Sequence, residues 1–122
     1  MTSLDNVITT SYPGHSDPRR TIIDITPRLK RFTTADMPGV RLGDHYHAKM
    51  QESFYVEHGR LLCKLEDINT KERREYMVEA GQSIRMPLYV AHLVLPGPRS
   101  EFLNIIERDF DPADLLSYRL NW

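Results

Sequence analysis

This sequence has few of the features that mark secreted, membrane-bound or disulfide-stabilised proteins. Cys63 is the only cysteine, so no intrachain disulfide can form. No stretch approaches the ~20 apolar residues of a membrane-spanning helix. The first residues lack the basic and apolar segments of a signal peptide. We therefore expect no membrane partner and a cytoplasmic location, and we expect Cys63 to be a small core residue.

An excess of charge of either sign is also absent. The chain has 16 Lys and Arg against 17 Asp and Glu, which gives a net charge of −1. Nucleic-acid binding needs a clustered basic surface, so we predict no nucleic-acid partner. The length of 122 residues suits one compact domain. No internal repeat or low-complexity tract interrupts it.

Short β-strands make up most of what remains. Apolar and β-branched runs between turn residues predict strands at 21–25, 29–33, 53–58, 60–66, 74–78, 83–86, 91–95 and 101–107. Many short strands at this spacing indicate an all-β, single-domain antiparallel barrel or jelly roll. We expect an N-terminal arm over 1–20, the barrel over 21–110 and a short C-terminal helix and tail over 111–122. Asp111 would cap that helix and Pro112 would open it.

Three histidines and one glutamate form the most informative pattern in the chain. His45 and His47 are two residues apart, so on a strand they project from the same face about 7 Å apart. Glu52 begins an apolar strand face that continues with Phe54, where an unpaired carboxylate would be costly. His92 lies in a second apolar strand. Together His45, His47, Glu52 and His92 predict a site for one divalent transition metal: Fe, Mn, Ni, Cu or Zn.

The same residues resemble the two sequence motifs of the cupin superfamily. The first motif matches from Gly39 through the histidine pair and Glu52 to Gly59, and the second matches at Gly81, Pro87 and His92. The second departs from the family pattern at Tyr89, where glycine is usual, and at Pro96, where asparagine is usual. The resemblance covers about residues 39–106 and implies an RmlC-like jelly roll in a small single-domain cupin. It does not specify a reaction, since cupins support many chemistries.

Three functions are open. The stretch Glu52-Ser53-Phe54-Tyr55 and the later Ile106-Glu107-Arg108 are somewhat similar to cupin dioxygenases, which implies a metal-dependent dioxygenase acting on a small organic substrate. The stretches Gly43–His47 and Phe110–Pro112 are similar to small cupins of nucleotide-sugar pathways, which implies a sugar isomerase or epimerase. The third possibility is a non-catalytic cupin that binds a small molecule. We rank the dioxygenase first, because the strand faces around Phe54 are rather apolar for a sugar.

Two further expectations concern substrate contacts and assembly. Tyr89, Phe54 and Met86 are our candidates for substrate binding, because they lie next to the expected ligands or on the same strand faces. The last residues are rich in large apolar side chains that need a partner, namely Tyr118, Leu120 and Trp122. Because a barrel this small has little surface to cover them, we predict a homodimer, with intramolecular packing on the barrel as the alternative.

Overall fold

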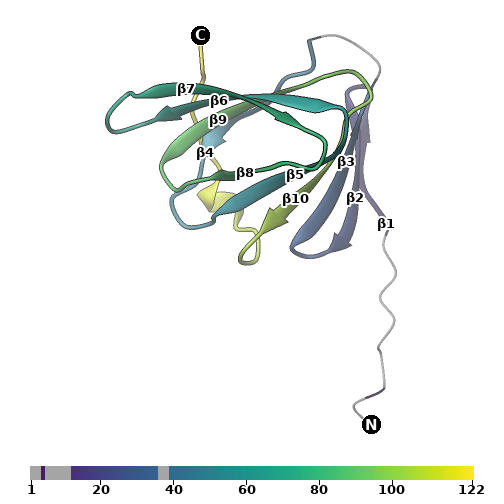
Figure 1. The fold of residues 1–122 in the computed structure, drawn as a ribbon. Helices are drawn as coiled ribbons and strands as arrows, with labels where there is room; N and C mark the ends of the chain where they lie inside the picture. Colours follow the sequence, from purple (N-terminus) through teal and green to yellow (C-terminus); the bar gives the residue numbers. More distant parts are fainter. Residues whose placement is uncertain (1–3, 5–11, 36–38) are drawn as a thin grey trace.

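Two antiparallel sheets face each other as the walls of a flattened barrel (Figure 1). The computed structural model describes Leu4 and residues 12–35 and 39–122. The first sheet has the strand order β1-β2-β3-β10-β5-β8, and the second has the order β11-β4-β9-β6-β7. All strand pairs among the described residues are antiparallel. This architecture confirms the predicted all-β cupin jelly roll.

The elements follow one another with short connections. Their bounds are β1 Tyr12–Asp17, β2 Arg20–Thr26, β3 Leu29–Thr34, β4 Leu42–Tyr46, β5 Glu52–His58, β6 Arg60–Asp67, β7 Arg73–Glu79, β8 Ser83–Met86, β9 Val90–Pro96, β10 Glu101–Ile106, the 3₁₀ helix η1 Pro112–Asp114, and β11 Leu116–Ser117. No helix in the described part of the chain is long and apolar enough to cross a membrane.

The predicted strands agree with the structure to within one or two residues at each end, but both ends of the chain differ. Residues 12–17, expected in an arm, form edge strand β1, which pairs with β2; residues 1–3 and 5–11 of that arm lie outside the described residues. The expected C-terminal helix is a single 3₁₀ turn, in which the backbone N–H of Ala113 donates to the Asp111 carboxylate at 3.0 Å. The division into arm, barrel and tail stays a prediction.

The main core lies between the two sheets. It contains alternate residues of facing strands: Phe54, Val56, Leu61, Cys63, Val78, Met86, Val94 and Phe102. Period-two alternation of the strands explains this set, because residues two apart point to the same side of a sheet. Cys63 is fully buried, as expected, and burial raises the pKa of its thiol to about 12. The thiol is therefore a packing group and not a nucleophile at neutral pH.

A second apolar cluster covers the outer face of the second sheet. Ala91 and Leu93 of β9 are fully buried there beneath Leu120, and Tyr118 and Trp122 pack beside them. This cover explains why β9 is apolar on both faces instead of alternating. The three C-terminal side chains that motivated the homodimer thus have partners within their own chain. The homodimer stays a prediction, but these side chains no longer argue for it.

Candidate metal centre

The four predicted ligands come together at one end of the space between the sheets. One potential ligand atom from each of His45, His47, Glu52 and His92 lies within 4.8 Å of all the others. Neighbouring donors are closer: His45 Nε2 is 3.1 Å from His92 Nε2, and Glu52 Oε1 is 2.9 Å from His92 Nε2. Two atoms bound at right angles, each about 2.1 Å from one ion, are about 3.0 Å apart. The donor set therefore fits a divalent transition metal.

A bulge in β4 orients the histidine pair. Gly43 pairs with Leu93 and His45 pairs with His92, so Asp44 is an extra residue, and its φ of 62° is left-handed. Gly43 has a φ of 110°, and a Cβ at this position would lie 2.6 Å from the backbone oxygen of His92. Only glycine fits this close approach without a backbone shift. Beyond the bulge, Tyr46 faces the outer cluster while the two histidines face inward.

Hydrogen bonds hold the ligand carboxylate and one imidazole in place. Glu52 accepts from the Asn104 side chain at 3.0 Å through Oε2, and its Oε1 lies 3.2 Å from His47 Nε2. Burial raises the pKa of Glu52, but hydrogen bonds from His47 and His92 outweigh it and hold the pKa well below its usual value. Burial also lowers the pKa of His47, but the bond to Glu52 reverses the effect and raises it. A bound metal would replace the proton that His47 Nε2 shares with Glu52.

His45 differs from the other three predicted ligands in exposure. It is half-buried, whereas the other three ligands are buried. Burial, followed by repulsion from His92, lowers the pKa of His45 to about 4. The ring is therefore neutral at pH 7 and keeps a lone pair for a metal or a proton.

Three of the four predicted ligands form the floor of a cleft of about 610 Å³. His45, Glu52 and His92 line it, and its inner wall is apolar, with Phe32, Phe54, Val94 and Phe102. The outer rim carries four arginines, Arg19, Arg20, Arg41 and Arg119, against a single rim carboxylate, Asp44. Arg41 binds both oxygens of Asp44 at 2.6 and 2.8 Å, and Arg119 is 3.2 Å from one of them. Arg19 pairs at 3.2 Å with Asp17, which does not line the cleft. The four arginines thus outnumber the two carboxylates with which they pair. The mouth of the cleft is therefore cationic.

The three predicted substrate contacts are placed differently from one another. Phe54 lines the cleft wall. Met86 is 1% exposed and packs in the main core, and Tyr89 packs near Tyr46, with ring centroids 6.3 Å apart. Neither Met86 nor Tyr89 is among the residues that line the cleft. The φ of 59° at Tyr89 accounts for the glycine that cupins usually have there, because this left-handed region strains any residue with a side chain.

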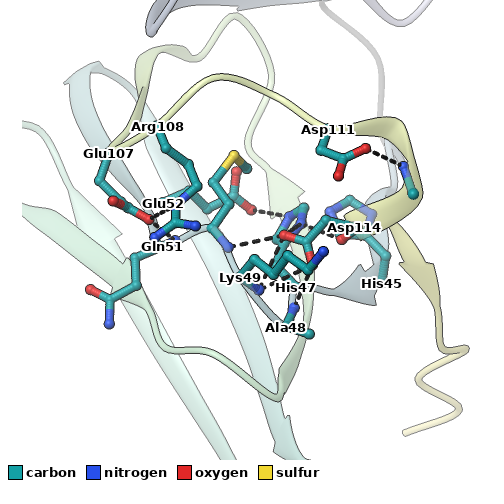
Figure 2. Close-up of polar contacts among 12 residues, drawn as sticks. His45, His47, Ala48, Lys49, Gln51, Glu52, Glu107, Arg108, Asp111 and Asp114 are labelled. Atoms are coloured by element: carbon teal, nitrogen blue, oxygen red, sulfur yellow. Dashed lines mark hydrogen bonds and ion pairs between the residues drawn. The ribbon is translucent and has the colours of Figure 1, made fainter.

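Sequence reasoning missed the residues that reach the site from the two ends of the chain. Arg19 and Arg20 end the segment 1–20 that we expected to be an arm, and β2 begins at Arg20; Arg119 belongs to the tail. Asp114 of η1 is buried against the loop that joins His47 to Glu52 (Figure 2). Neither group carries a motif signal, because its role depends on strands that are distant in sequence.

Comparison with known proteins agrees with this fold and gives the family. The fold is that of a cupin, and the chain belongs to the family described as the polysaccharide biosynthesis C-terminal domain, whose model matches residues 15–112. A comparison with curated proteins gave no match.

Among solved structures, the chain resembles the capsular polysaccharide assembling protein CapF of Staphylococcus aureus, with a TM-score of 0.80 and 18% identity over 94% of this chain. It spans only 33% of the CapF chain. A double mutant of the 3,4-ketoisomerase QdtA of Thermoanaerobacterium thermosaccharolyticum, in complex with TDP, matches with a TM-score of 0.65 and 16% identity over 73% of this chain and 64% of that one. A mutant of the Bacillus subtilis oxalate decarboxylase OxdC matches with a TM-score of 0.70 and 16% identity, over 91% of this chain and 33% of that one. At these identities the likeness establishes the fold alone.

Proposed function

We propose that this chain is a metal-dependent sugar isomerase or epimerase domain whose substrate is a keto-sugar linked to a phosphorylated group. One observation carries the proposal: the predicted ligands open into a cleft whose mouth is ringed by arginines. A neutral small organic substrate would gain nothing from those charges. A phosphorylated sugar would place its anionic part at the rim and its sugar ring on the floor.

Arg20 is the rim residue that best fits an anionic ligand. Its side chain is 19% exposed, and its Nε has no hydrogen-bond partner among the described residues. Its ion-pair partner Asp17 is 3.9 Å from Nη1. A buried guanidinium N–H without a partner is costly in the free protein. The Arg20 side chain lines the cleft, so a phosphate there would pair with its positive charge.

The floor residues suit chemistry at a carbonyl group. A divalent ion held by the four ligands would withdraw electron density from a substrate carbonyl or hydroxyl oxygen, which makes the neighbouring C–H more acidic. The neutral His45 faces the cleft and is the least buried ligand, so it is also the candidate for accepting a proton from carbon if it leaves the metal or if the site is metal-free. Asn104 holds the second oxygen of Glu52 and thereby fixes the carboxylate on the floor.

The family and the structural neighbours support this choice. The family description concerns polysaccharide biosynthesis, and QdtA is a 3,4-ketoisomerase that was solved with TDP. The apolar strand faces, which led us to rank a dioxygenase first, form only the inner wall of the cleft. That wall, with Phe32, Phe54 and Phe102, is the observation that keeps an oxygen-dependent enzyme for a small organic substrate as the second candidate.

Solvent deuterium exchange separates the two reactions. A panel of nucleotide-linked keto-sugars is incubated with Zn²⁺-, Mn²⁺- or Fe²⁺-loaded protein in D₂O and analysed by mass spectrometry, while an oxygen electrode follows the same mixtures under air. Isomerase or epimerase activity introduces deuterium at a carbon next to the carbonyl without oxygen uptake. Oxygen uptake with a small organic acid or phenol, and no deuterium in any sugar, would favour the dioxygenase. Tight binding without either signal would favour a non-catalytic binder.

A further inference from the structure

Asp114 touches the predicted metal centre in two ways. Its backbone oxygen lies 2.8 Å from Nδ1 of His47, in position to accept the proton of that nitrogen. Its carboxylate accepts hydrogen bonds from the three successive backbone N–H groups of Ala48, Lys49 and Met50, at 2.8, 3.0 and 2.9 Å (Figure 2). Asp114 is only 4% exposed, and its bonds to His47 and Met50 are buried.

The first contact fixes the state of a ligand. When Nδ1–H of His47 donates to a carbonyl, the neutral ring has its lone pair on Nε2, the nitrogen that donates to Glu52 when the ring is protonated. This is the tautomer that a metal at the predicted site requires. By contrast, Nδ1 of His92 has no hydrogen-bond partner among the described residues.

The second contact fixes the loop between two ligands. Residues 48–51 connect His47 to Glu52, and three of their N–H groups converge on one carboxylate. The loop would otherwise have three polar groups to satisfy at a part-buried position. The distance between His47 and Glu52 therefore depends on a residue more than 60 positions away in sequence.

The rest of the C-terminal segment is attached to the same histidine strand. β11 pairs with β4, with Leu116 opposite Tyr46 and Ser117 opposite His45. Further along, the backbone N–H of Leu120 donates to the Asp44 carboxylate at 3.0 Å. Residues 111–122, which we term the C-terminal clasp, thus hold the His45–His47 strand along its length.

We propose that Asp114 is a positioning residue of the metal centre, and that metal binding and docking of the C-terminal clasp stabilise each other. The inference rests on the metal site of the proposed function. Because coupling between two equilibria is reciprocal, a clasp that raises metal affinity must itself be held more firmly when metal is bound. Outer residues that orient a metal ligand typically contribute about tenfold to a hundredfold in metal affinity.

A pair of matched substitutions in the clasp tests this role. Asp114→Asn keeps the size of the side chain and the backbone carbonyl, but it loses the charge and one acceptor oxygen for the loop. Asp111→Asn makes the same chemical change in the same segment at an exposed residue that caps η1 and does not contact the loop. Zn²⁺ affinity is measured by competition with a chelator, and the Co²⁺ absorption spectrum reports the geometry of the ligands. We expect a loss of about tenfold or more and an altered spectrum for Asp114→Asn only.

Hydrogen exchange on the wild-type protein provides the reciprocal measurement. Zn²⁺ should slow exchange of the amides of residues 48–50 and of the clasp. If the clasp exchanges equally fast with and without Zn²⁺, the proposal is overturned, even where Asp114→Asn fails to fold. Equal Zn²⁺ affinity and equal Co²⁺ spectra for wild type and Asp114→Asn would overturn it while leaving the metal site intact. Absence of Zn²⁺ binding in wild type would instead reject the metal site itself, and the coupling with it.

Discussion

Arg20 provides a sharp test because its charge should lower stability in the free protein and raise affinity for an anion. Its side chain is largely buried, and its Nε lacks a partner in the described structure. Burial, followed by the neighbouring Arg19, lowers the pKa of Arg20, which means that its surroundings disfavour the charged form. Enzymes commonly lose stability at such binding groups.

The expected magnitudes for Arg20→Met follow from these contacts. An unsatisfied buried donor lowers the free energy of unfolding by about 1–3 kcal/mol. An ion pair as long as the one to Asp17 raises it by only about 0–1 kcal/mol. Methionine keeps the apolar part of the side chain that packs in the wall. The substitution should therefore raise the free energy of unfolding by about 1 kcal/mol. Loss of a charge-assisted hydrogen bond of about 1.5–3 kcal/mol should weaken anion binding by about tenfold to a hundredfold.

Urea denaturation measures the first effect, and calorimetric titration with UDP or TDP measures the second. Arg28→Met is the matched control, because Arg28 is 54% exposed, pairs with the exposed Asp109 and lies outside the cleft. It removes the same charge and should change neither quantity appreciably. The reasoning fails if Arg20→Met destabilises the protein and binds the nucleotide as tightly as Arg28→Met does.

Three further predictions address the ligands and the C-terminal packing. Elemental analysis of protein purified without an affinity tag should find about one transition metal per chain. His47→Ala should lose the metal, and His58→Ala, at an exposed histidine, should keep it. Equal, low metal contents in wild type and His47→Ala after reconstitution would contradict the site. Zn²⁺ affinity should fall by up to about tenfold per pH unit below the raised pKa of His47, because a proton must leave the ring before the metal binds. Protonation of His45 should add to the loss only near its pKa of about 4. A Zn²⁺ affinity that stays constant between pH 7 and 5 in chelator competition would refute this prediction. Leu120→Ala should lower the free energy of unfolding by about 2–3 kcal/mol, whereas Leu115→Ala, at a 46% exposed residue, should change it by less than about 0.5 kcal/mol; denaturation midpoints that rise with protein concentration would show instead that the apolar tail packs between two copies.

Local patterns account for most of what could be predicted. The alternation of Glu52, Phe54 and Val56 predicted a buried face, and all three are buried. The two-residue spacing of His45 and His47 placed both on the inner face, and the structure brings Glu52 and His92 to them. These predictions succeeded because strand periodicity is a short-range property that the sequence carries directly. The resemblance to cupin motifs supplied the pairing of distant strands that periodicity alone does not.

The sequence by itself therefore determined the strands, the inward-facing group of three histidines and one glutamate, and the cupin fold. Tertiary structure alone decided what surrounds that set. Arg20 and Arg119 meet at one cleft mouth, and Asp114 reaches the loop after His47, although each pair is separated by more than 60 residues. Such contacts depend on which strands become neighbours and on where the chain ends dock. No local period records them, because side chains on separate strands acquire a common environment only when the sheets close around the core.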